Sequence, residues 1–148
     1  MKIEIYTDGA CIGNPGPGGW AAVILVNEDK KEIFGGEKVT TNNRMELTAA
    51  IKALEYFAEK DGKQPSLKQI KIFTDSNYVK ECITNWIHVW EKNNWKTSDK
   101  KNVKNVDLWK KLKELSKFNT IEWIWVKGHS ENPMNELADQ LAKKATPI

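Results

Sequence analysis

Four acidic residues have types and positions suited to metal chemistry, and two of them end similar sequence phrases. Asp8 ends the alternating run I-E-I-Y-T-D, and Asp75 ends the later run I-K-I-F-T-D. β-branched and aromatic residues favour extended backbone, so residues 3–9 and 70–76 are predicted strands that carry an acid at their ends. Gly9 is expected to let the chain turn away directly after Asp8. Open α/β folds place their sites at the carboxyl ends of strands, which predicts that both acids lie at one sheet edge.

The other two acids lie on predicted helices. Residues 45–59 and 135–145 have apolar side chains at helical spacing, with Glu46 on the flank of the first apolar face and Asp139 beside the second. A carboxylate beside a buried face is costly unless a cation meets it. Spacing alone leaves an alternative open for Glu46, which is a first-turn acid that complements the helix dipole.

If these four carboxylates converge, they need protons or a cation among them. Two unit charges about 4 Å apart repel by about 4 kcal/mol at an effective dielectric constant near 20. A site with only oxygen ligands suits Mg²⁺ or Mn²⁺ better than Zn²⁺. Magnesium held by a few carboxylates and a substrate phosphate is the arrangement of phosphoryl-transfer enzymes.

The remaining pattern predicts an α/β chain in the order three strands, helix, strand, helices, strand, helix. Besides the segments above, strands are predicted at 20–26, 31–40 and 120–126, and helices at 76–87, with Ser76 as its cap, and at 106–115. Residues 10–19 are rich in glycine and proline and are predicted to form a loop. A phosphate-binding loop is disfavoured there because the Walker lysine is missing and Pro15 and Pro17 have no amide donors.

Bulk composition indicates one globular domain over residues 1–148. The chain is 40% hydrophobic and 29% charged, which argues against disorder and a membrane span. It enters its first strand without a signal-like segment, so a cytoplasmic location is expected. Cys11 and Cys82 lie far apart without a zinc or redox spacing and are expected to be free thiols.

Basic charge is concentrated in residues 92–113. This stretch has eight lysines and two aspartates, whereas the whole chain has a net charge of only +3. Such an asymmetry is typical of a protein that grips a polyanion with one part, although a solvated lysine-rich face is the alternative. Trp86, Trp90 and Trp95 flank the stretch, and packing is favoured over stacking on bases as their role.

Five phrases give the chain a resemblance to a known family. They are Y-T-D-G-A-C-I-G-N-P-G-P-G-G-W, T-T-N-N-R-M-E-L, F-T-D-S-N-Y-V, W-K-T-S-D-K-K-N-V-K-N-V-D-L-W and W-V-K-G-H-S, between residues 6 and 130. In this order they resemble the type 1 ribonuclease H family. The resemblance implies a ribonuclease H-like fold, which is a mixed five-stranded sheet flanked by helices with a basic helical protrusion.

The resemblance also implies an endonuclease that hydrolyses the RNA strand of RNA–DNA hybrids and leaves 5′-phosphate and 3′-hydroxyl ends. Asp8, Glu46, Asp75 and Asp139 would bind two Mg²⁺ ions, with Mn²⁺ as an alternative. The strand of Asp8 is then expected at the centre of the sheet beside the strand of Asp75, which makes Asp8 the expected ligand shared by both ions. His129, in a mobile glycine-containing loop, would assist proton transfer or product release. The expected partner is the hybrid duplex. The protein is expected to be a monomer that does not associate with a membrane.

Hybrid-binding residues are implied by the same matches. Short polar side chains would contact the minor groove and read 2′-hydroxyls, and the protrusion would contact phosphates with salt-dependent affinity. The first set is Cys11, Asn14, Thr41, Asn42, Asn43 and Asn77, and the protrusion set is Trp86, Trp90, Trp95, Lys96, Lys100, Lys101 and Lys104.

Two features of this chain stand apart. Arg44 is its only arginine, which indicates a planar multi-donor head that braces the helix of Glu46. Leu137 follows Asn135-Glu136 where many family members have arginine, and Glu131-Asn132 replaces a commoner glycine-containing pair.

The alternative functions are a hybrid-binding module of the same fold without catalysis, which the intact carboxylates disfavour, and a DNA-cutting nuclease of that fold, which the T-T-N-N-R-M-E phrase disfavours.

Overall fold

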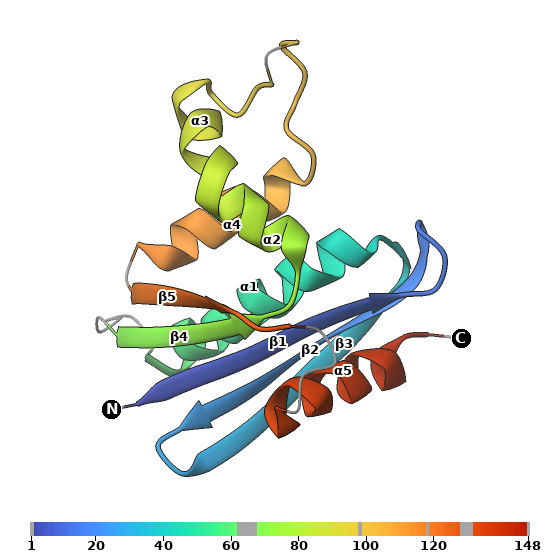
Figure 1. Ribbon diagram of the computed structural model, residues 1–148, viewed down its shortest axis with the longest axis vertical. Helices are drawn as coiled ribbons and strands as arrows, with labels where there is room; N and C mark the ends of the chain where they lie inside the picture. The colour runs from blue at the N-terminus through green and yellow to red at the C-terminus, as the bar shows by residue number, and fades with distance from the viewer. Residues whose placement is uncertain (1, 62–67, 98, 118, 128–131, 148) are drawn as a thin grey trace.

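A five-stranded mixed sheet with helices on both faces forms the body of the molecule (Figure 1). The computed structural model describes residues 2–61, 68–97, 99–117, 119–127 and 132–147. The strand order β3-β2-β1-β4-β5 confirms the predicted mixed sheet. Within the described residues, no helix is long and apolar enough to cross a membrane.

β1 (Ile3–Cys11) is the central strand of the sheet, as expected. It pairs antiparallel with β2 (Gly16–Val26) and parallel with β4 (Lys68–Thr74), the strand that precedes Asp75. β3 (Asp29–Thr40) pairs with β2, and β5 (Asn119–Trp125) pairs with β4, so these two strands form the edges.

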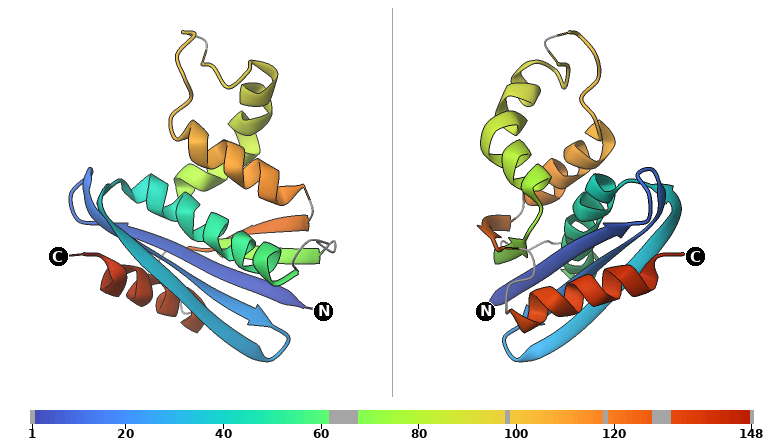
Figure 2. Two further views of the ribbon diagram at one scale, coloured as in Figure 1. Left: turned by 180° about the vertical axis from the view of Figure 1, so that it is seen from behind. Right: turned by 45° about the vertical axis from the view of Figure 1, so that its right-hand side comes forward.

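Helices cover the two faces separately. α1 (Asn42–Asp61) packs on β1 and β2 and contacts α4 (Val106–Ser116), whereas α5 (Pro133–Ala145) packs on the opposite face against β1, β2 and β3 (Figures 1 and 2). The strand pleat explains the division, because alternate side chains point to opposite faces. Ile5 belongs to the α1 face and Tyr6 to the α5 face.

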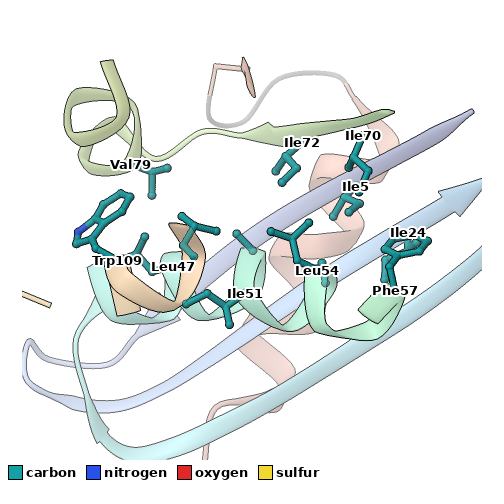
Figure 3. Close-up of a cluster of buried hydrophobic side chains, with 14 of the residues drawn as sticks. Ile5, Ile24, Leu47, Ile51, Leu54, Phe57, Ile70, Ile72, Val79 and Trp109 are labelled. Atoms are coloured by element: carbon teal, nitrogen blue, oxygen red, sulfur yellow. The ribbon is translucent and has the colours of Figure 1, made fainter. Parts of the chain in front are cut away.

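The larger core lies between the sheet and α1. Ile5 and Ile72 from the sheet face Leu47 and Leu54 from α1, and Trp109 of α4 is fully buried at one end of the cluster (Figure 3). The smaller core on the other face contains Tyr6, Val23 and Ala138. Both faces of β1 are therefore buried, which fixes the position of its carboxyl end.

The protrusion consists of three short helical segments and the chain that returns to α4. They are α2 (Asn77–Glu81), the π-helical turn η1 (Cys82–Trp86) and α3 (Ile87–Lys92). They rise away from the sheet, and α4 leads back from them towards β5 (Figures 1 and 2). The basic helical protrusion expected from the lysine-rich stretch is thus present.

The predicted loop over 10–19 is wrong in most of its length. β1 continues through Cys11 and β2 starts at Gly16, so only residues 12–15 connect the two strands. Gly9 does not turn the chain, because it pairs with Trp20 within the sheet. Glycine is required there for a different reason: a Cβ on Gly9 would lie 2.5 Å from the backbone nitrogen of Glu46. Its absence lets α1 approach the strand closely.

The predicted helix over 76–87 is interrupted and longer than expected. It continues to Lys92, and the π-helical turn inserts an extra residue into the helical spacing. Ile87 is buried in the core, while Trp86, for which packing was the favoured role, is 50% exposed. The predicted cap is confirmed, since Ser76 Oγ accepts a hydrogen bond from the Val79 amide at 3.2 Å.

Other boundaries differ by a few residues, for capping reasons. α1 begins at Asn42 because Thr41 Oγ1 accepts from the Arg44 amide at 3.2 Å. α5 begins at Pro133, which suits a first helical position, and Asn132 caps it by accepting from the Met134 amide at 3.0 Å.

Candidate active site

Asp8 and Asp75 meet at the edge where β4 ends. The parallel pairing of β1 and β4 runs to Tyr6 and Phe73, and continuing that register by two residues sets Asp8 opposite Asp75. Thr7 extends the link, because its hydroxyl donates to the Phe73 carbonyl at 3.4 Å. The repeated strand phrase therefore does deliver two acids side by side.

Glu46 reaches the same point from α1. Its helix packs against Gly9, one residue beyond Asp8, and the Glu46 side chain is almost fully buried. Carboxylate oxygens of Asp8, Glu46 and Asp75 all lie within 4.8 Å of one another. The buried flank position predicted for Glu46 is confirmed.

Asp139 completes the group from the opposite face of the sheet. It hydrogen-bonds with Asp8, and both line one cavity of about 570 Å³. We call Asp8, Glu46, Asp75 and Asp139 the carboxylate cluster. The cavity is lined mainly by acids and amides, namely Asp8, Asn42, Asn43, Glu46, Asp75, Asn77, Asn135, Glu136, Asp139 and Gln140, together with Gly9, Ser76 and Tyr78.

Burial and crowding disfavour the charged forms of these carboxyls. Burial first, then the hydrogen bond with Asp139 and the charges of Asp75 and Asp139, raise the pKa of Asp8 from 3.8 to about 8. Burial, followed by the charges of Asp8 and Asp75, holds the pKa of Glu46 well above its ordinary range. The cluster is therefore a place where protons or cations are taken up at neutral pH.

One oxygen of the cluster has unsatisfied hydrogen-bonding capacity. Glu46 Oε2 is buried and has no hydrogen-bond partner among the residues that the structure describes. A buried acceptor without a partner calls for an explanation, and a cation among carboxylate oxygens supplies one. The donor set, which is all oxygen in the described part of the chain, fits Mg²⁺ or Mn²⁺.

Amide side chains surround the cluster. Asn42, Asn43 and Asn77 line the same cavity, whereas Asn14 lies beside it and accepts from the Asn42 amide at 3.1 Å. The Cys11 thiol lies 2.9 Å from the carbonyl of Gly13 at the adjoining turn. Three of the side chains predicted to contact a duplex therefore surround the acids, and Cys11 and Asn14 lie at the adjoining turn.

Comparison with known proteins decides the family. The family model described as RNase H matches residues 1–146. The chain belongs to the RNase H family. It is 57% identical over 142 residues to the ribonuclease H of Dechloromonas aromatica, an alignment that covers 96% of this chain and 91% of that protein.

Solved RNase H structures share the fold. LC9-RNase H1, described as a type 1 RNase H with the type 2 active-site motif, has a TM-score of 0.81 and 29% identity over 97% of this chain and 71% of that chain. LC11-RNase H1, solved in complex with an RNA/DNA hybrid, has a TM-score of 0.75 and 24% identity, over 98% and 96%. The resemblance read from the five phrases is confirmed.

The lysines of the protrusion that were expected to contact phosphates lie on the surface of this RNase H chain. Lys96, Lys100, Lys101 and Lys104 are all exposed. Lys96 Nζ donates to Asn102 Oδ1, and their backbones form an isolated β-bridge that shapes the loop.

The three tryptophans of the protrusion divide into two groups. Trp90 and Trp95 pack against the larger core, and Trp90 lies 6.2 Å from Trp109 between ring centroids. Packing, the favoured role, is therefore correct for these two. Trp86 is half exposed and lines a groove beside Lys101 and Lys104, which the partly buried Trp90 also lines.

Arg44 forms a junction that sequence reasoning only partly anticipated. Its guanidinium donates to both Asp107 carboxylate oxygens, at 3.1 and 2.8 Å, and to Asn105 Oδ1 at 3.2 Å. Asn105 and Trp109 in turn donate to the Tyr78 hydroxyl at 3.0 and 3.1 Å. Arg44 thus braces the helix of Glu46, as predicted, and joins it to α4 and α2.

Several lining residues were missed by sequence reasoning. Tyr78 follows the F-T-D-S phrase, and Asn135, Glu136 and Gln140 share the cavity-facing side of α5 with Asp139. The spacing of one turn between Glu136 and Gln140 was the available signal. Leu137, the departure from the family pattern, packs against the smaller core, whereas His129 and Glu131 lie outside the described residues.

Proposed function

We propose that this chain is a ribonuclease H that hydrolyses the RNA strand of RNA–DNA hybrids and leaves 5′-phosphate and 3′-hydroxyl ends. Family membership over nearly the whole chain supports the enzyme class. The observation that carries the proposal is the meeting of the carboxylate cluster with Asn42, Asn43 and Asn77 in a single cavity. Acids and duplex-reading amides at one point suit phosphodiester hydrolysis on a nucleic acid.

The carboxylate cluster fits two divalent cations, Mg²⁺ or Mn²⁺. Asp8 is the proposed shared ligand, because it contacts Glu46 on one side and Asp139 on the other. When bound, the ions would activate the attacking water and stabilise the leaving 3′ oxygen. The unpartnered Glu46 Oε2 supports a cation at this place.

The chain's other residues position the duplex. Asn42, Asn43 and Asn77 would hydrogen-bond 2′-hydroxyls, together with Cys11, Asn14 and Thr41 at the adjoining turn. The Thr41 hydroxyl already accepts from the Arg44 amide, which fixes its orientation. Lysines of the protrusion would neutralise phosphates, and Trp86 would pack against the bound strand. His129 is proposed to assist proton transfer or product release.

A cleavage assay tests this proposal. The protein is incubated with labelled RNA–DNA hybrid, double-stranded RNA or double-stranded DNA, each with Mg²⁺ or EDTA. We expect cleavage of the RNA strand of the hybrid alone, and only with Mg²⁺. Cleavage in EDTA, or equal cleavage of all three duplexes, would refute the mechanism. Binding of the hybrid without cleavage would instead support a non-catalytic module.

A monomeric state and a cytoplasmic location of the protein stay predictions.

A further inference from the structure

Two glycines on the sheet face below α5 stand directly opposite each other. Gly19 of β2 pairs with Gly36 of β3. A Cβ on Gly19 would lie 2.8 Å from Thr146 Oγ1 and closer still to the Ala142 carbonyl oxygen. A Cβ on Gly36 would lie 2.9 Å from Pro147 Cδ and closer still to the Ala145 carbonyl oxygen. We call this pair the glycine seat.

The glycine seat sets how deeply the second half of α5 lies on the sheet. Ala142 is fully buried, and its carbonyl also accepts a hydrogen bond from the Thr146 hydroxyl at 2.9 Å. The first half of α5 is held differently, by the Asn132 cap and by Ala138 in the smaller core. Asp139 lies between these two attachments, one turn before Ala142.

Asp139 is the acid of the cluster that α5 carries. Its side chain is 38% exposed, and it forms an ion pair at 3.0 Å with Lys143 of the same helix. Asp8 and Glu46, in contrast, are almost fully buried. A shift of α5 would therefore move Asp139 relative to Asp8, Glu46 and Asp75, which lie on other elements.

We propose that Gly19 and Gly36 are positioning residues that hold Asp139 against Asp8 through the depth of α5, an inference that rests on the proposed metal-dependent hydrolysis. A carbon–oxygen contact needs about 3.3 Å, so a methyl group in the seat pushes α5 outward by about 1 Å. Displacements of that size in a catalytic group cost up to about a hundredfold in rate. The glycines thus act on cation binding rather than on duplex binding.

Gly35 provides a matched control. It is the neighbour of Gly36 on β3 and faces the other side of the strand, where the three atoms nearest to an added Cβ, at 2.8 to 2.9 Å, all belong to the indole of Trp20. Gly35→Ala and Gly36→Ala make the same change in the same strand. Only Gly36→Ala alters the seat of α5.

The experiment compares parent, Gly35→Ala and Gly36→Ala. Mg²⁺ binding is measured by calorimetry without nucleic acid, and hybrid cleavage is measured as kcat and KM across Mg²⁺ concentrations. We expect Gly36→Ala to weaken Mg²⁺ binding and to lower kcat at limiting Mg²⁺ by about tenfold or more, with KM for the hybrid unchanged. Gly35→Ala crowds Trp20 instead of α5, so it should bind Mg²⁺ like the parent.

A second background separates positioning from general damage. In an Asp139→Asn chain, Gly36→Ala should cause no further loss of Mg²⁺ binding, because the group that it displaces is already gone. An equal loss in both backgrounds, or a Gly36→Ala protein that matches Gly35→Ala, would overturn the inference. A parent without Mg²⁺-dependent cleavage would instead defeat the proposed function.

Thr146→Val decides the question if Gly36→Ala does not fold. It keeps a similar side-chain shape and removes only the hydrogen bond to the Ala142 carbonyl. Loosening of that turn should weaken Mg²⁺ binding about two- to fivefold, less than a methyl group in the seat. Parental Mg²⁺ binding by Thr146→Val would overturn the inference in that case.

Discussion

Arg44 grips Asp107 with two parallel hydrogen bonds, of 3.1 and 2.8 Å, across 63 residues of sequence. Arg44 lies two residues before Glu46, and Asp107 lies in the first turn of α4 at the base of the protrusion. The pair therefore ties the helix that supplies an active-site acid to the part expected to hold the duplex.

Replacing Arg44 by lysine should weaken this tie, because a single ammonium cannot form both hydrogen bonds and also reach Asn105. Asp107 is 64% exposed, so we expect a stability loss of no more than about 1 kcal/mol. KM for the hybrid should rise more than kcat falls. Thermal unfolding and steady-state kinetics test this, with Lys52→Arg on α1 as a control; an unchanged KM would contradict a positioning role.

Arg44 and Asp107 also make the stability of the fold depend on pH. Arg44 holds the pKa of Asp107 below its ordinary value of 3.8, so the pair stabilises the fold above that value and loses its effect as the pH falls below it. Asp107→Asn should remove this part of the acid sensitivity. Urea unfolding of parent and variant at pH 3 and pH 6 measures the difference, and an identical pH dependence would contradict it.

Asp8→Asn should abolish cleavage and, without metal, stabilise the fold at alkaline pH. With its pKa raised to about 8, folded Asp8 holds a proton between about pH 4 and pH 8 that the unfolded chain has lost. The stability of the metal-free parent therefore falls as the pH rises through this window. In Asp8→Asn, the decrease in the free energy of unfolding across this window should be smaller than in the parent by on the order of a few kcal/mol. Urea unfolding in EDTA at pH 5 and pH 9 tests it, with exposed Asp29→Asn as control.

Lysines of the protrusion should determine the salt dependence of hybrid binding. Replacing Lys100 and Lys101 by alanine should raise KM and reduce the slope of log affinity against log salt by about 2. The control is Lys30→Ala with Lys31→Ala, an equally exposed adjacent pair on the hairpin of β2 and β3. Equal slopes in the two double variants would show that the protrusion lysines form only a solvated face.

Trp86 and Trp90 should respond differently to removal. Trp86 is half exposed, so Trp86→Ala should cost little stability and raise KM for the hybrid. Trp90 packs against the larger core, and its loss should cost about 3 kcal/mol or somewhat less, given its partial exposure. Denaturant unfolding and hybrid binding separate the two effects; a large stability loss in Trp86→Ala would contradict this division.

Sequence patterns predicted the order of strands and helices along the chain and the acids of the site because those features are visible in local stretches. The repeated I-x-I-x-T-D phrase shows period-2 alternation that ends in an acid, and no distant contact is needed to recognise it. The helices of Glu46 and Asp139 were likewise visible in their apolar spacing.

The features that were missed depend on contacts between distant segments. Gly9 looks like a turn residue in sequence, yet its role is set by α1 packing on it. The π-helical turn that exposes Trp86 depends on which side chain best fits the core. Tyr78 became part of the site through Asn105 and Trp109, about 30 residues away, which no local pattern reveals.

The carboxylate cluster draws one acid from each of β1, α1, the end of β4 and α5. No hairpin, helix pair or partly docked intermediate contains all four. Hydrolytic activity therefore requires all four elements to be packed together, and a chain in which one of them has not yet docked can meet RNA without cutting it.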